Sequence, residues 1–197
     1  MVRLAALMLL ASLLSVAGVA GAEPAGTPAC DASVAKRANP DLDKLFEELK
    51  REPNAKAATR ITRRIWAEWF DSGSDTVNLL LNWSQEAIEK EKFEVALDLL
   101  DQVVVLDPGF AEGWNRRATL HFMMDRYDKS MADIACTLLL EPRHFGAWSG
   151  MAAIYKNSGL KEKALEAYLK VLEFYPADVN AQKAVLELSE ELAKDAI

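Results

Sequence analysis

Two adjacent arginines and two histidines are the residues of this chain best suited to chemistry. Arg116 and Arg117 interrupt the first apolar stripe of AEGWNRRATLHFMMDRYDKSMADIACTLLLEP, the segment from Ala111 to Pro142. A buried guanidinium without a partner is strongly unfavourable, so Arg117 must pair with an acid or reach the edge of a groove. Two interpretations stay open. Arg117 could form an internal ion pair that fixes the register of packed elements, or Arg116, helped by Arg117, could receive a carboxylate from a ligand.

The histidines do not form a catalytic constellation in the sequence. His121 falls on a mostly apolar helix face, which favours a packed core histidine over a general base. His144 follows Pro142 in a turn, where we expect it to be solvated. Asp125 is one acid near His121, whereas zinc normally takes at least three protein ligands. There is also no glycine-rich phosphate loop or nucleophile elbow. We therefore predict no catalytic residue, no metal site and no cofactor, and an enzyme built around His121 remains the remote alternative.

The chain repeats itself with a period of 34 residues. The prolines Pro108, Pro142 and Pro176 are each one period apart, and the same step aligns Trp114 with Trp148. A column of small residues recurs as well, made of Ala96, Ser130 and Ala164. Each unit has two apolar stripes at helical spacing, and the second unit should form helices over about 112–124 and 128–140. A helix pair cannot bury its stripes alone, so consecutive units must stack.

These residues carry a family resemblance. A helix–turn–helix unit of this length, with Trp, a small residue four positions later, an aromatic at the turn and a closing acid–Pro, resembles the tetratricopeptide repeat. AEGWNRRATLHFMMDRYDKSMADIACTLLLEP and FGAWSGMAAIYKNSGLKEKALEAYLKVLEFYP are two clear copies, and VNLLLNWSQEAIEKEKFEVALDLLDQVVVLDP is a third that lacks the leading Trp. The chain is also similar to small exported proteins of this kind from Gram-negative bacteria. The resemblance implies an all-α, right-handed superhelical solenoid.

The domain organisation follows from the period and its flanks. Asn39 and Pro40 suit the cap and first position of a helix. We predict a signal peptide over 1–22, a disordered linker over 23–40, a helical lead-in over 41–73 that resembles a degenerate repeat, repeats over 77–110, 111–144 and 145–178, and a capping helix over 179–197.

The first helices of stacked units line the concave side of such an array. Positions two, five, nine and twelve of each unit should therefore face a groove that suits an extended peptide. With Arg116, the predicted groove residues are Asn78, Leu81, Gln85, Glu112, Asn115, Thr119, Phe122, Ser149 and Lys156, and Ile88, Gly146 and Ala153 fill the remaining positions. Ordinary solvated helix surface is the alternative for each of them.

The resemblance also excludes one known specialisation. Relatives that hold the Glu-Glu-Val-Asp tail of chaperones use a clamp of Lys, Asn and Arg. The matching positions here are Leu81, Gln85, Arg116, Gly146 and Gly150, so that clamp is absent. The leading prediction is a non-catalytic module that binds a protein or extended peptide of the cell envelope. The alternative is a self-assembling or complex-scaffolding subunit, with Trp66, Trp69 and Trp83 at an interface. The burial habits of tryptophan favour instead a core between the first two helix pairs for these three residues.

The N-terminus and the charge bear on location and partners. Arg3, an apolar run to about Val16 and the small residues up to Ala22 are typical of a signal peptide cleaved after Ala22, with a retained membrane anchor as the alternative. Without residues 1–22, 22 basic residues face 30 acidic ones, and the net charge is −8. Such a surface repels nucleic acid and anionic lipid. We predict a periplasmic protein that contacts membrane only through its signal segment and that could form a homo-oligomer.

The chain has two cysteines, Cys30 and Cys136. An exported protein meets oxidising conditions, so a disulfide between them is permitted. An internal bridge and two unpaired or intermolecular thiols both stay open.

Overall fold

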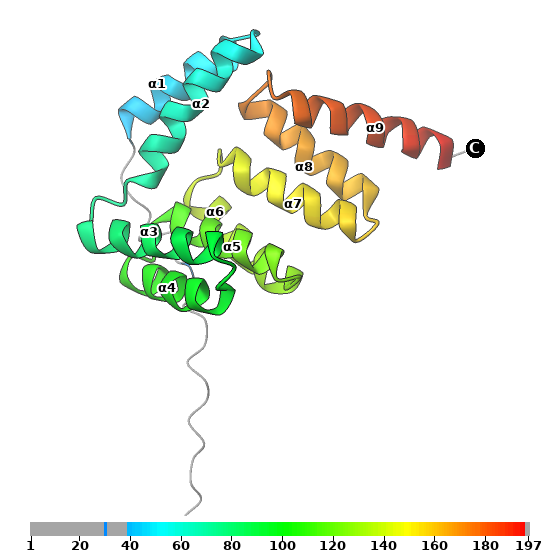
Figure 1. Cartoon of the computed structure of the whole chain (residues 1–197). Coiled ribbons are helices and arrows are strands. Elements are labelled where there is room, and N and C mark those ends of the chain that lie inside the picture. The colour runs from blue at the N-terminus through cyan, green and yellow to red at the C-terminus, as the bar shows by residue number, and fades with distance from the viewer. Residues whose placement is uncertain (1–29, 31–38, 196–197) are drawn as a thin grey trace, which may run out of the picture.

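The computed structural model describes residues 30 and 39–195, and this part of the chain is built from helices without strands (Figure 1). The all-α fold that the period predicts is confirmed. The helices are α1 (Pro40–Arg51), α2 (Ala55–Phe70), α3 (Asp75–Glu89), α4 (Phe93–Leu106), α5 (Ala111–Met123), α6 (Tyr127–Leu140), α7 (Phe145–Asn157), α8 (Lys161–Phe174) and α9 (Val179–Asp195).

The predicted signal peptide, 1–22, and most of the predicted linker, 23–40, lie outside the described residues. Helix α1 begins at Pro40 and its cap is Asn39, whose side chain accepts hydrogen bonds from two backbone N–H groups. This confirms the predicted start of the helical region. None of the described helices is both long and apolar enough to cross a bilayer.

Three antiparallel helix pairs repeat with the predicted period. The pairs α3–α4, α5–α6 and α7–α8, here called units 1, 2 and 3, stack in chain order, and α9 packs against α8. The indole nitrogens of Trp114 and Trp148 donate to the carbonyls of Pro108 and Pro142, both at 2.9 Å. Gln182 in α9 makes the same bond to Pro176 at 2.7 Å. Equivalent residues therefore occupy equivalent surroundings from unit to unit.

The turns and helix contacts inside the units also recur. Glu91, Asp125 and Gly159 are one period apart, and each turns the chain between paired helices with a positive φ, 55°, 56° and 73°. Ala96, Ser130 and Ala164 are buried where the paired helices approach most closely. A larger side chain in this column would force the two helices apart.

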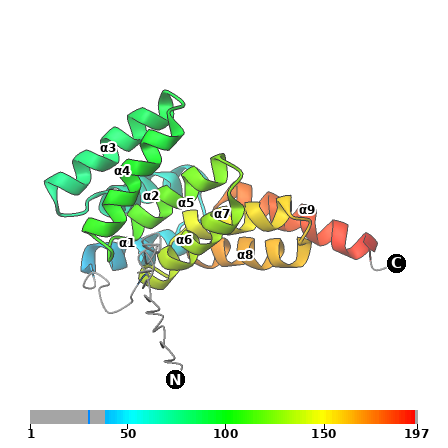
Figure 2. The same ribbon diagram turned by 90° about the horizontal axis from the view of Figure 1, so that it is seen from below.

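The α1–α2 pair does not continue the stack, although the sequence places it before unit 1. Its buried residues pack against Phe145, Val171, Ala177 and Ala181, which belong to α7, α8 and the start of α9. Unit 1 lies at one end of the array and α9 lies at the other end (Figures 1 and 2). The α1–α2 pair bridges the two ends, because it precedes unit 1 in the sequence and packs in space against α7, α8 and the start of α9. The expected core between the first two helix pairs is therefore wrong: Trp66 and Trp69 pack against unit 3, and Trp83 is 49% exposed.

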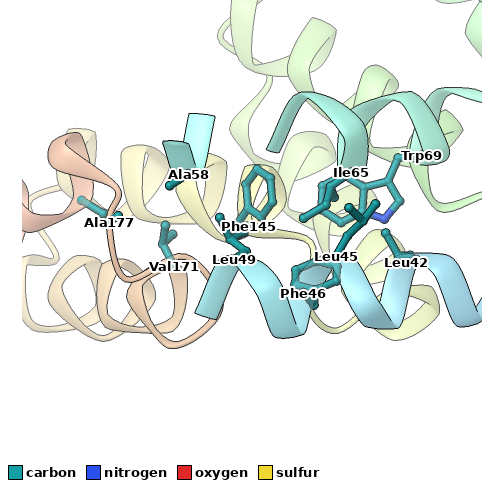
Figure 3. Packing of buried hydrophobic residues seen from close by; sticks show 11 residues of the cluster. Leu42, Leu45, Phe46, Leu49, Ala58, Ile65, Trp69, Phe145, Val171 and Ala177 are labelled. Carbon is teal, nitrogen blue, oxygen red and sulfur yellow. The ribbon is translucent and has the colours of Figure 1, made fainter. Parts of the chain in front are cut away.

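Aromatic side chains explain this placement. The rings of Phe46 and Trp69 lie 6.4 and 5.0 Å from that of Phe145, and Figure 3 shows the three within one cluster. Trp66 lies directly on the backbone of α7, because a Cβ on Gly146 would be 2.8 Å from its ring. The apolar face of α1–α2 thus finds its burial partners on α7–α9, where burial of large rings is strongly favourable.

A disulfide joins Cys30 to Cys136 of α6, with a Cα–Cα distance of 5.4 Å. The half-cystine at 136 is buried beside Trp114 and Val104, and Cys30 is partly buried against the same cluster. The bridge closes a loop of 106 residues that includes α1 to α5. It therefore restricts the unfolded chain considerably.

We expect reduction of this bridge to lower the free energy of unfolding by about 2–4 kcal/mol, because a long loop gains entropy in the unfolded state. Urea unfolding followed by circular dichroism, with and without a phosphine reductant, measures the difference. A variant with both cysteines changed to serine is the control and should not respond to the reductant. Equal unfolding curves for the oxidised and reduced wild-type chain would contradict this expectation.

Candidate functional site

A groove of about 680 Å³ lies between α2 and the first helices of units 1 and 2. Its position agrees with the concave side that the repeat predicts. We call it the α2–α5 groove, and its lining residues are Arg63, Trp66, Ala67 and Phe70 of α2, Gln85 and Ile88 of α3, and Glu112, Asn115, Arg116, Thr119 and Met123 of α5.

Six of the thirteen predicted groove positions meet in this groove. The structure brings together Gln85 and Ile88 of unit 1 with Glu112, Asn115, Arg116 and Thr119 of unit 2. These residues come from α3 and α5, the first helices of two consecutive units, so the 34-residue period was sufficient to place them on the same side of the array.

The other predicted residues have different partners, so they are not part of the groove. Leu81 is buried in the core of unit 1, and Phe122 packs against Tyr127 at 5.4 Å. Asn78 accepts a hydrogen bond from the backbone N–H of Ser72 and so fixes the loop before α3. In unit 3, the Ser149 hydroxyl donates to a carbonyl of its own helix, and Lys156 pairs with Glu187 of α9 at 3.8 Å. The position-two residue of unit 3, Gly146, lies under Trp66.

The sequence did not indicate the contribution of α2. Arg63, Trp66, Ala67 and Phe70 lie outside the 34-residue period, and long-range packing alone brings them to the groove. Their sequence signal is an aromatic-rich helix face, which predicts burial without naming the partner.

Glu112 fixes the base of the groove. It is only 2% exposed, and its carboxylate accepts hydrogen bonds from Asn115 Nδ2 at 2.9 Å and Arg116 Nε at 3.0 Å. His144 Nε2 lies 3.1 Å from the same carboxylate. A buried carboxylate with three such partners is held in one orientation.

His144 is fully buried, so the expectation of a solvated turn residue is wrong. Its Nδ1 accepts the backbone N–H of Ala147 at 3.1 Å and thereby caps α7. Because Nδ1 is an acceptor, Nε2 carries the proton and donates to Glu112. The ring also stacks on Trp69, with centroids 4.0 Å apart and planes 9° from parallel. His144 thus connects the α2 aromatic cluster to the base of the groove.

Arg116 connects three helices at the groove wall. Besides Glu112, it donates from Nη1 to Gln85 Oε1 of α3 at 2.8 Å, and its guanidinium lies over the Phe70 ring of α2 at 4.7 Å. Its Nη2 makes no hydrogen bond to any residue that the structure describes. The side chain is partly exposed, so an arginine with donor capacity faces the groove.

Arg117 points away from the groove into the interface between units 1 and 2. Its Nε and Nη2 donate to the carboxylate of Asp133 in α6 at 2.8 and 2.7 Å. Its Nη1 donates to Asp101 of α4 at 2.8 Å. Burial acts to lower the pKa of Arg117, but the bonds to Asp133 and Asp101 outweigh it and the pKa is raised. The internal ion pair is therefore the correct interpretation. Asp133 belongs to the same unit as Arg117 and Asp101 to the unit before it, so the ion pair joins units 1 and 2.

His121 is buried next to this ion pair and not at the groove. Its Nε2 is 3.8 Å from Asp133, and its Nδ1 has no hydrogen-bond partner within the described part of the chain. Burial outweighs the attraction of Asp133 and lowers the pKa of His121. Among the described residues, no three His, Cys, Asp or Glu side chains form a group that could hold a metal ion.

Comparison with known proteins places the chain in a family. No protein-family model matches it. A TPR repeat-containing protein of Rhizobium etli is 53% identical over 152 residues, which are 77% of this chain and 74% of that protein. The chain belongs to the tetratricopeptide-repeat (TPR) family. TPR repeats generally form a non-catalytic protein-interaction fold.

Solved TPR structures share the fold of this TPR protein. The first TPR domain of Spaghetti (RPAP3), bound to an HSP90 peptide, has a TM-score of 0.57 and 22% identity, and the match covers 61% of this chain and 95% of that one. MamA has a TM-score of 0.54 and 20% identity, with 76% and 82% covered. At these identities the similarity concerns the fold.

The chain itself suggests a test of the Arg117 ion pair, because unit 3 carries Met151 and Ala167 one period after Arg117 and Asp133. We expect Arg117→Met alone to lower the free energy of unfolding by about 3–5 kcal/mol, since it leaves the buried Asp133 without its main partner. Adding Asp133→Ala should restore most of this loss. Urea unfolding of the wild type and both variants measures it, and a double variant no more stable than the single one would contradict the assignment.

His121 should make the stability of the protein depend on pH. Because its pKa is lowered in the folded state, the unfolded chain binds more protons below a pH of about 6.5. The free energy of unfolding should therefore fall as the pH drops below this value, and His121→Gln should flatten that slope. Unfolding curves at a series of mildly acidic pH values compare the two proteins. Identical slopes would show that His121 does not titrate between the two states.

Proposed function

We propose that this TPR protein is a non-catalytic binding module of the bacterial cell envelope, and that its α2–α5 groove holds an extended segment of a partner protein. The observation that carries the proposal is the groove itself, an open channel on the concave side with polar, cationic and apolar side chains along it. The TPR domain of Spaghetti, which shares the fold, has an HSP90 peptide bound.

The groove favours a segment with acidic and apolar side chains. Arg63 makes no ion pair with a described residue, and Arg116 keeps Nη2 for a ligand, while the carboxylate of Glu112 is already held by internal donors. Phe70 and Met123 are half-exposed beside them and provide apolar contact area. The groove is thus cationic in a protein that is acidic overall, which attracts a partner of opposite charge.

A non-catalytic role agrees with the state of the groups that could do chemistry. His121 and His144 are both buried, and Arg117, Asp133 and Glu112 serve internal hydrogen bonds. A substrate in the groove would not reach the two imidazoles. The chain therefore offers recognition rather than general acid–base chemistry.

Export to the periplasm is part of the proposal. It is supported by the signal-peptide pattern of residues 1–22 and by the Cys30–Cys136 disulfide, which suits an oxidising compartment. The relative from Rhizobium etli is a bacterial protein, which agrees with a bacterial origin.

Selection of random peptides displayed on phage tests the groove directly. We expect enrichment of peptides that combine acidic and apolar residues, and an affinity loss of roughly tenfold or more for Arg63→Glu by calorimetry, because a charge pair turns into a repulsion. Arg60→Glu is the matched control, since Arg60 is exposed on the same helix one turn earlier and does not line the groove. Selected peptides that bind Arg63→Glu as well as the wild type would contradict the proposal.

A further inference from the structure

The two adjacent arginines of α5 bind their carboxylates in different ways. Arg117 donates from Nε and Nη2 together to the single carboxylate of Asp133, at 2.8 and 2.7 Å. Arg116 donates to Glu112 from Nε alone, at 3.0 Å, and its Nη2 makes no hydrogen bond within the described part of the chain. Because Nε and Nη2 lie on one edge of the guanidinium, a carboxylate that is free to turn occupies both. Glu112 is therefore held in an orientation that uses only half of this edge.

Other donors hold the second oxygen of Glu112. Arg116 binds Oε1, whereas Oε2 accepts from Asn115 Nδ2 at 2.9 Å and lies 3.1 Å from His144 Nε2. Glu112 is 2% exposed and His144 is fully buried, so water does not compete for these bonds. Two donors on Oε2 thus leave Glu112 a single oxygen with which to reach Arg116.

The ring of His144 has a fixed orientation. Its Nδ1 accepts the backbone N–H of Ala147, and its face stacks on Trp69 with the ring centroids 4.0 Å apart. Both contacts direct Nε2, which carries the proton, at the Glu112 carboxylate. His144 is not among the residues that line the α2–α5 groove, so it acts on the groove through Glu112.

We propose that His144 is a positioning residue for the α2–α5 groove, which keeps Glu112 on one nitrogen of Arg116 and leaves Nη2 available to a carboxylate of the bound partner. This inference rests on the proposed function, and it assigns the preference for acidic segments to a buried residue outside the groove. Without the donor from His144, Glu112 turns toward Arg116 and occupies Nε and Nη2 together, as Asp133 does with Arg117. The groove then keeps its walls but loses a donor for the partner.

Two substitutions separate this role of His144 from its role as the cap of α7. His144→Asn keeps an acceptor near the place of Nδ1 and is a favourable cap, but its side chain is too short to reach Glu112. His144→Gln is the matched control. Its amide nitrogen extends to the place of Nε2 and donates to Glu112, whereas glutamine is a poor cap. Circular dichroism and urea unfolding check that both variants are folded.

Calorimetry with two peptides measures the preference of the groove. One is an acidic peptide selected on the wild-type protein, and the other is the same peptide with Asn and Gln in place of Asp and Glu. We expect the wild type to prefer the acidic peptide by roughly tenfold or more, His144→Asn to lose most of this preference and His144→Gln to keep most of it. A general loss of stability weakens the binding of both peptides alike, so the ratio of the two affinities isolates the positioning role.

A second variant and a structure make the test independent of how well the His144 variants fold. Asn115→Ala removes the other donor to Oε2 and should lower the ratio in the same direction. A crystal structure of His144→Asn without peptide should show Glu112 bonded to both Nε and Nη2 of Arg116.

The outcomes distinguish this inference from the proposed function. A His144→Asn protein that keeps the full preference, or in which Glu112 stays on Nε alone, would overturn the positioning role while the proposed function stands. A His144→Gln protein that loses the preference as completely as His144→Asn would overturn it too. A wild type that binds both peptides equally would overturn the preference for acidic segments, and this inference with it.

Discussion

The packing of the α1–α2 aromatic face onto α7–α9 is the interaction on which the rest of the structure depends. Trp69 stacks on His144, Trp66 lies on Gly146, and Phe46 and Phe145 complete the cluster. This packing takes α2 across the concave side, where it becomes one wall of the α2–α5 groove, and it leaves α3 without a preceding helix pair. One tertiary contact therefore creates both the candidate binding site and the exposed end of the array.

The adjacent residues Arg116 and Arg117 have different surroundings because successive helical residues point in different directions. Arg117 turns into the interface between units 1 and 2, where two aspartates hold it, and Arg116 turns toward the groove. The buried charge of Arg117 is matched by bidentate geometry, which a guanidinium provides and an ammonium does not. The Glu112 carboxylate has the corresponding role at the base of the groove, since it orients Arg116 and links it to His144.

The sequence predicted the structural features that recur with the 34-residue period. The recurring prolines and tryptophans, the small column at Ala96, Ser130 and Ala164, and five of the eight predicted concave positions of α3 and α5 follow from local pattern and stacking. The helices also begin and end close to where that pattern places them. The position of α1–α2 could not be predicted. The amphipathic pattern of a helix shows that one face must be buried, but it does not show which other helices cover that face. The environment of His144 was missed for the same reason: its neighbours Trp69 and Glu112 are 75 and 32 residues away in the sequence.

The contact between α2 and α7 requires glycine at position 146. The Trp66 ring occupies the space into which any other residue at this position would extend, since even a Cβ would come within 2.8 Å of the indole. The ring is a rigid obstacle, held among Trp69, Phe70 and Phe145. The hydrogen at this position thus allows α2 to approach α7 closely, and a methyl group in its place would push apart two helices of which one, α2, forms a wall of the channel.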